Sequence, residues 1–143
     1  MTSSVRLLGP VGVVWAVMLA LAGCSGPRLV PVSGSVVWED GTPAVELADG
    51  SVTFESVSSE RRISCVGNID KSGQFTMMTN APGDGVPPGE YRVVVTEPVA
   101  DVDVAPKPIL DPRFLKFETS GLTVTITNQP RRDLTLKVAR IGR

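Results

Sequence analysis

Gly89-Glu90-Tyr91-Arg92-Val93-Val94-Val95-Thr96 is the stretch that decides the fold. Tyr91, Val93 and Val95 stand on alternate positions, which is the period of a β-strand with one buried face. Pro98 ends the pattern, because proline has no N–H to donate to a strand ladder. The stretch therefore predicts the strongest strand of the chain. We expect Tyr91 to bury its ring while its hydroxyl reaches the surface or a backbone carbonyl.

The same alternation recurs along the chain, and short turns rich in glycine, proline, asparagine and aspartate separate the strands. Residues 44–47 are expected to form a weak extended segment, and residues 68–73 a polar turn. No stretch after the leader shows three turns of amphipathic helix. The pattern predicts one all-β domain over residues 32–140, a seven-stranded antiparallel β-sandwich. The other strands are expected at residues 32–39, 51–55, 63–67, 74–79, 122–127 and 134–138.

The first of these strands shows most clearly which side chains should form the core. Val32, Gly34, Val36 and Trp38 alternate with serines and other residues. Since successive side chains of a strand point to opposite faces, these four are expected to face inward together. The same rule places Cys65 on the apolar side of its strand.

A hydrophobic leader precedes the domain and ends in Leu21-Ala22-Gly23-Cys24. Arg6 is the leader's one charged residue, and the apolar run from Val11 to Ala22 would cover about 18 Å as a helix, against roughly 30 Å for a bilayer core. These features are typical of a secretory signal peptide over residues 1–23. The final four residues resemble the lipobox of bacterial lipoproteins, in which the cysteine thiol receives a diacylglycerol and becomes residue one after cleavage.

This resemblance implies a membrane anchor through lipid on Cys24, followed by a short tether over residues 24–31. Acyl chains gain about 0.8 kcal/mol for each buried methylene, so they hold a protein at a bilayer without a spanning segment. Ser25 after the cysteine implies the periplasmic face of an outer membrane, or the cell surface. A plain secreted protein in which Cys24 is incidental is the alternative.

The body of the chain also resembles a known family. The motifs are Val32-Ser33-Gly34-Ser35-Val36 with Asp40-Gly41-Thr42-Pro43, then Ser51-Val52-Thr53-Phe54 and Gly73-Gln74-Phe75-Thr76. Their order is similar to that in the carboxypeptidase regulatory-like domain, a transthyretin-like sandwich. The later Pro88-Gly89-Glu90-Tyr91 and Ser120-Gly121-Leu122-Thr123 extend the likeness to small lipoproteins of planctomycete bacteria. The chain departs from the family pattern at residues 44–49 and 60–65.

The charge balance disfavours a nucleic-acid partner. The chain has 14 basic and 15 acidic side chains, a formal net charge of −1, and cleavage of the leader with Arg6 makes the mature chain more negative by one. The tail from Arg131 to Arg143 is locally basic, which a solvated strand face explains. Acylation of Cys24 would leave Cys65 as the one remaining thiol, so no intramolecular disulfide is expected.

The composition also limits catalysis. There is no histidine, which removes mechanisms that use a Ser-His-Asp or Cys-His pair and zinc sites that need histidine. Cys65 is expected to be a small buried hydrophobe and not a nucleophile. The transthyretin-like enzymes that hydrolyse hydroxyisourate depend on histidines and a distinctive C-terminal tetrapeptide, whereas this chain ends Arg140-Ile141-Gly142-Arg143. We expect no enzyme activity and no cofactor.

Loop carboxylates are the candidates for a metal site. Asp101 and Asp103, with Asp111 further on, or Asn68 with Asp70, could offer oxygens to calcium. Calcium takes six or more closely spaced oxygens, and neither group resembles an EF-hand loop, so solvated loop acids are the preferred interpretation.

Two functions therefore stay open. One is a lipid-anchored, non-enzymatic envelope protein that binds a protein through a sheet edge or a polymer, such as a polysaccharide, across a face. The other is a hydrolase or calcium-dependent module built from Asp101, Asp103 and Cys65. A structural domain with no single ligand is a third, plainer possibility.

Overall fold

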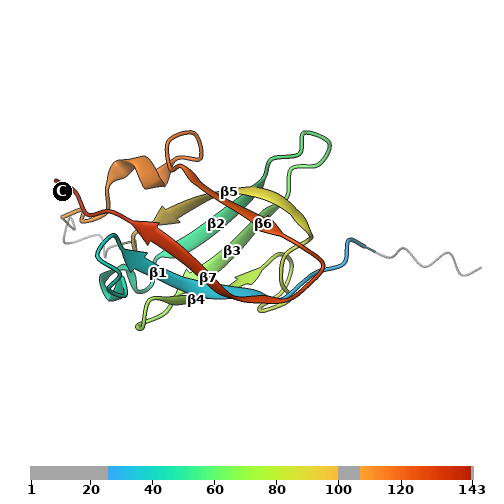
Figure 1. The fold of residues 1–143 in the computed structure, drawn as a ribbon, viewed down its shortest axis with the longest axis horizontal. Coiled ribbons are helices and arrows are strands. Elements are labelled where there is room, and N and C mark those ends of the chain that lie inside the picture. The colour runs from blue at the N-terminus through green and yellow to red at the C-terminus, as the bar shows by residue number, and fades with distance from the viewer. Residues whose placement is uncertain (1–25, 100–106, 143) are drawn as a thin grey trace, which may run out of the picture.

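The computed structural model describes residues 26–99 and 107–142 (Figure 1). The expected signal peptide and the lipobox residues Leu21, Ala22, Gly23 and Cys24 lie outside this range, as do Asp101 and Asp103. The described chain is all-β, as expected, and its strands form one sheet in the order β6-β5-β2-β3-β4-β1-β7. The strands are β1 (Val32–Trp38), β2 (Ser51–Ser56), β3 (Ser64–Ile69), β4 (Gln74–Met78), β5 (Gly89–Thr96), β6 (Leu122–Ile126) and β7 (Arg131–Val138).

The sheet is mixed, so the expectation of a purely antiparallel arrangement was wrong. Five of its neighbouring pairs are antiparallel, but β1 and β7 run parallel, with Ser35 opposite Thr135 and Trp38 opposite Val138. Alternation in a sequence tells which face of a strand is buried, but it does not tell which neighbour the strand takes or in which direction. The sheet curls into a nearly closed barrel with β6 and β7 at its two ends (Figure 1).

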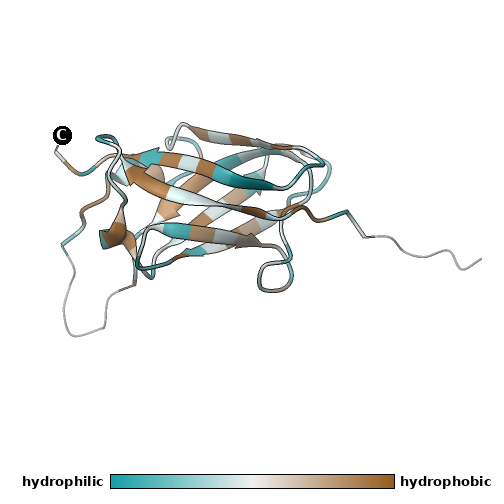
Figure 2. Cartoon of the chain, turned by 60° about the horizontal axis from the view of Figure 1, so that its bottom comes forward, coloured by the Kyte–Doolittle hydropathy of each residue, from teal (hydrophilic) through white to brown (hydrophobic). Residues whose placement is uncertain are grey.

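The inward faces of the strands form the core, and the expected alternation is confirmed. Val32, Val36 and Trp38 are at most 1% exposed, whereas Ser33 and Ser35 between them are half-buried. The alternation appears in Figure 2 as apolar bands that interrupt the polar ones along the strands. Tyr91 lies in the core at 5.8 Å from the Phe54 ring centroid and donates a hydrogen bond of 2.7 Å from its hydroxyl to the Pro87 carbonyl.

Three local features differ from the sequence-based expectations. Residues 45–47 form a short 3₁₀-helix, η1 (Val45–Leu47), and not an extended segment, because the turn buries Leu47. Strand β3 continues through Asn68 to Ile69, so these two residues pair with β2 or β4 and do not belong to the following turn. A second 3₁₀-helix, η2 (Pro112–Leu115), packs against β5, and Val94 is only 6% exposed although it points outward.

The N-terminal segment joins the barrel earlier than the expected first strand. Val30 is buried and exchanges two backbone hydrogen bonds of 2.9 Å with Val86. Gly85 makes this approach possible, since a Cβ there would lie 2.2 Å from the Val30 carbonyl oxygen. Close packing therefore begins at Val30, inside the predicted tether.

Candidate functional site

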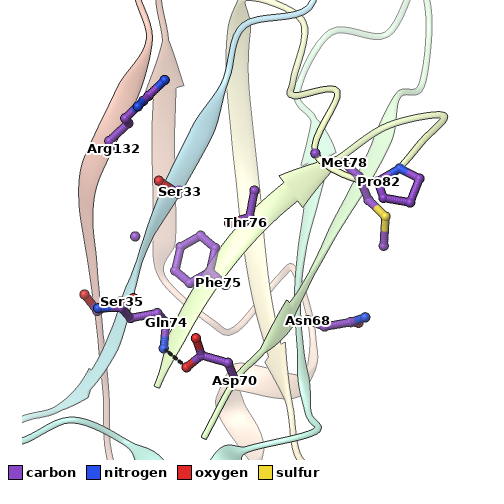
Figure 3. A pocket seen from close by; sticks show the side chains of 12 residues that line it. Ser33, Ser35, Asn68, Asp70, Gln74, Phe75, Thr76, Met78, Pro82 and Arg132 are labelled. Atoms are coloured by element: carbon purple, nitrogen blue, oxygen red, sulfur yellow. Dashed lines mark hydrogen bonds between the residues drawn. The ribbon is translucent and has the colours of Figure 1, made fainter. Parts of the chain in front are cut away.

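A groove of about 460 Å³ lies on the outer face of the barrel. Its lining residues come from four neighbouring strands, from the β3–β4 turn and from the loop after β4 (Figure 3). Most of them are hydroxyl, amide or charged groups, and few are apolar. We call this site the polar groove, and its lining comprises Ser33, Gly34, Ser35, Asn68, Asp70, Gln74, Phe75, Thr76, Met78, Pro82, Gly83 and Arg132.

Strand pairing brings the hydroxyl and amide groups of the polar groove side by side. Ser33 lies opposite Thr76 and Ser35 opposite Gln74 in the β1–β4 ladder, and Asn68 lies opposite Thr76 in the β3–β4 ladder. Side chains that are directly opposite in a ladder point to the same face with Cβ atoms about 5 Å apart. The floor of the polar groove is therefore a row of hydrogen-bonding groups at the spacing of the strands.

A β-bulge places Arg132 at one side of this row. Val32 pairs with Arg131, but Gly34 pairs with Leu134, so β7 has one residue more than β1 between these two pairs. Bulges turn the side chains of the bulged strand away from the regular alternation. Figure 3 shows Arg132 on its strand across the polar groove from Asn68. Within the described residues, no carboxylate forms an ion pair with Arg132.

Asp70 occupies the turn at the end of the groove. Its Oδ1 atom accepts hydrogen bonds from the Ser72 hydroxyl (2.6 Å), the Ser72 N–H (2.8 Å) and the Gln74 N–H (3.0 Å). These bonds, of which the one from the Ser72 hydroxyl has the largest effect, lower the pKa of Asp70 below its usual value. The carboxylate thus braces the β3–β4 hairpin and adds a negative charge to this end of the groove.

The calcium candidates that the structure describes take part in other local contacts. Asn68 lies on the outer face of β3, and Asp70 already accepts three hydrogen bonds within its own turn. Asp111 accepts from the Arg113 N–H at 3.0 Å and so caps η2. In residues 26–99 and 107–142, no three carboxylate or thiol side chains gather in a way that could hold a metal ion.

Cys65 lies in the core, as its position in the alternation predicts. Its side chain is fully buried and its sulfur is 3.2 Å from the Thr79 hydroxyl. Burial raises the pKa of the Cys65 thiol, which disfavours the thiolate that a nucleophile needs. Asp101 and Asp103, the expected companions of Cys65 in a hydrolytic site, lie outside the described residues.

Reasoning from the sequence missed the polar groove. Ser33, Ser35, Gln74 and Thr76 fall on the polar half of alternating strands, which the sequence shows. The meeting of these side chains in one groove depends on the order β3-β4-β1-β7, which the sequence does not show. The bulge that brings Arg132 to the groove leaves no recognisable pattern in the sequence either.

No protein-family description, curated protein or solved structure matches this chain. In the part of the chain that the structure describes, no helix has the length and apolar character needed to cross a bilayer.

Proposed function

We propose that this protein is a lipid-anchored, non-enzymatic module of a bacterial cell envelope that binds an acidic polysaccharide in the polar groove. The observation that carries the proposal is the convergence of hydroxyl, amide and guanidinium groups on one hollowed face. A compact body of the transthyretin-like type, as the sequence resemblance implies, would present this face to the surrounding envelope.

The shape of the polar groove suits a linear polar polymer. Neighbouring strands lie about 4.8 Å apart, so the distance from β3 to β7 across the groove is about 14 Å, enough for several sugar rings. Sugar hydroxyls both donate and accept hydrogen bonds, which matches the serine, threonine, asparagine and glutamine side chains of the floor. The shallow and polar character of the groove is less suited to a compact apolar ligand.

The charges of the groove favour an acidic polymer in one orientation. Arg132 offers a planar guanidinium that can bind a carboxylate through two parallel hydrogen bonds. Asp70, on β3's side of the groove, would repel a second carboxylate. A uronic-acid unit is therefore expected to lie beside Arg132, with neutral hydroxyls along β1 and β4.

A binding role has more support than a hydrolytic one. The buried Cys65 thiol has a raised pKa, and the sequence contains no histidine to act as a general base. Incubation of the protein with a long acidic polysaccharide should leave its chain length unchanged, as size-exclusion chromatography would measure. A progressive shortening that depends on the protein would contradict this part of the proposal.

Retardation in polyacrylamide gels that contain polysaccharide tests the polar groove directly. The mature protein should be slowed by alginate and polygalacturonate, which carry carboxylates, and less by neutral dextran. Arg132→Ala should weaken the retardation by alginate about tenfold, because a charged hydrogen-bonded pair contributes roughly 1.5 kcal/mol or more. Arg61→Ala, which removes an exposed arginine from the 57–63 connection, is the matched control. Equal retardation of both variants, or none for the wild type, would refute binding in the groove.

The anchor rests on the Leu21-Ala22-Gly23-Cys24 motif and is tested separately. The native protein should lack residues 1–23 and carry a diacylglycerol-sized mass increment on Cys24, and it should enter the detergent phase in a phase-separation assay. Cys24→Ala should move it to the aqueous phase. An unmodified thiol in the native protein would disprove the anchor without affecting the polar groove.

A further inference from the structure

Strand β6 lies at one end of the sheet and has one unpaired edge. Strand β6 pairs with β5 on one side, and no ladder joins it to β7 anywhere in residues 26–99 and 107–142. The 127–130 connection links β6 to β7 in sequence, yet the two strands end up as the two free sides of the nearly closed barrel (Figure 1). An unpaired edge presents a row of N–H and C=O groups to any extended chain that approaches.

The register identifies which backbone groups face this edge. The Glu90 carbonyl accepts from the Val57 N–H, so Glu90 points toward β2 and its neighbour Tyr91 points toward β6. Tyr91 is opposite Val124, so Val124 is bonded to β5, and the residues on either side of it turn their backbone groups the other way. The N–H and C=O groups of Thr123 and Thr125 therefore face the open edge.

The β6 edge lacks the features that usually protect such an edge. Its outward side chains are Thr123 and Thr125, both exposed and uncharged, and β6 contains no proline or bulge. Strand β7 differs, since its exposed residues include Arg132, Asp133 and Lys137, and it carries the bulge. Charged side chains and bulges discourage strand addition, so β7 is protected by its own residues, whereas β6 has no such residue of its own.

A cation lies at one end of the open edge. Arg131 reaches across from β7, and its Nη1 atom donates to the Thr125 carbonyl at 3.2 Å. The side chain is 45% exposed, and its ion pair with Asp133 is long, at 3.9 Å, and solvent-accessible. A carboxylate on an incoming strand would compete well for this guanidinium, and its arrival would free the Thr125 carbonyl for the strand's own N–H.

We propose that the β6 edge binds an extended peptide segment of a partner protein, paired with the backbone of Thr123 and Thr125, whose acidic side chain contacts Arg131. Backbone pairing supplies the affinity in this mode of recognition, and the side chains beside the edge supply the specificity. The surface is distinct from the polar groove, so the proposal stands or falls independently of polysaccharide binding.

The probe is a soluble eight-residue peptide in which glutamate alternates with valine, added to the mature protein. Binding should slow hydrogen exchange at the Thr123 and Thr125 amides and should weaken when lysine replaces glutamate in the peptide. Thr123→Pro removes an N–H that the fold does not use and should reduce affinity at least tenfold. Thr123→Val keeps the N–H and should bind as the wild type does. Circular dichroism would confirm that both variants are folded.

Other results would overturn the proposal. One is that the peptide slows hydrogen exchange at amides other than those of β6. The others are equal affinity of the proline and valine variants for the peptide, and equal affinity of the protein for the lysine and glutamate peptides. A concentration-dependent dimer that excludes the peptide would show that a second copy of the chain occupies the edge. Arg131→Ala should abolish the preference for the glutamate peptide while leaving the Thr123 amide protected, and a preference that survives this change would remove Arg131 from the site.

Discussion

Alternate residues of β1 and β4 form an inner and an outer face, and the two faces have different roles. Val36, Trp38 and Met77 face inward and are almost fully buried, whereas Gln74 and Thr76 face outward and are exposed. Burial of a large apolar side chain contributes about 1.5–3 kcal/mol, and an exposed polar side chain contributes little. Stability thus depends on one face, which leaves the other free to carry the polar groove.

Of the changes considered, replacement of Trp38 on the inner face should have the largest effect on stability. Trp38 is 1% exposed, its indole N–H donates to Glu46 at 3.0 Å, and the Arg140 guanidinium lies 4.1 Å from its ring centroid. Trp38→Ala should lower the free energy of unfolding by about 3–5 kcal/mol, because it leaves a cavity in the core. Urea denaturation followed by circular dichroism measures this. The half-buried neighbour Val37 is the control, and Val37→Ala should cost no more than about 1 kcal/mol. Similar losses of unfolding free energy for Trp38→Ala and Val37→Ala would contradict the view that stability depends on the inner face.

A methyl group at Gly34 should disturb the contact between β1 and β7. A Cβ at Gly34 would lie 2.0 Å from the backbone oxygen of Leu134, and a strand cannot give way by that much without losing its register. Gly34→Ala is therefore expected to destabilise the protein by about 3 kcal/mol. Gly26→Ala is the matched control, since nothing lies within 4 Å of a Cβ there. A wild-type unfolding midpoint for Gly34→Ala would show that the parallel pairing is looser than the structure indicates.

Trp38 and Gly34 also illustrate which features of the fold the sequence could predict and which it could not. The alternation from Val32 to Trp38 predicted the inner face correctly, because a period of two is a local property of a strand. Glycine at position 34 also fell on the inner face, but the reason for glycine there is the backbone of Leu134, one hundred residues away in sequence. Contacts of this kind depend on strand order, and no local pattern encodes it.

The candidate site was harder to predict than the fold. The alternation predicts Cys65 in the core, where it lies. For the Tyr91 hydroxyl the sequence allows the surface or a backbone carbonyl, and the structure shows a bond to the Pro87 carbonyl. The polar groove was missed because serines and threonines on the solvent face of a strand look alike whether or not a ligand binds there. The bulge at Arg132 was missed because it reflects the pairing of β7 with β1 and not its own residues.

Tyr91 gives a smaller and pH-dependent test of the inner face. Tyr91→Phe removes the bond to the Pro87 carbonyl and should cost about 1–2 kcal/mol near neutral pH, since that carbonyl is left buried without its partner. Burial raises the pKa of Tyr91 to about 12 in the folded protein, above the usual value of about 10. The folded state therefore favours the neutral phenol.

The sign of the pH effect follows from this difference. Between pH 10 and pH 12 the unfolded chain releases the Tyr91 proton while the folded protein retains it, so stability falls as the pH rises. Tyr91 is the one tyrosine of the chain, so Tyr91→Phe should show a shallower fall over this range. Urea midpoints measured from pH 8 to pH 11.5 would test it, and parallel profiles for the two proteins would contradict a buried neutral phenol.

Replacement of Gln74 should have the smallest effect on stability, and it should separate the binding role of the outer face from the stabilising role of the inner face most clearly. Its side chain is exposed and lines the polar groove. Its backbone N–H donates to Asp70 in the turn, and a change of side chain leaves this bond in place. Gln74→Ala should change the free energy of unfolding by less than about 0.5 kcal/mol and yet weaken retardation by alginate several-fold. Gln129→Ala, in the exposed connection after β6, should change neither. A Gln74 variant that binds alginate normally would mean that the outer face of β4 only shields the core. The difference between the two faces would then concern stability alone and not binding.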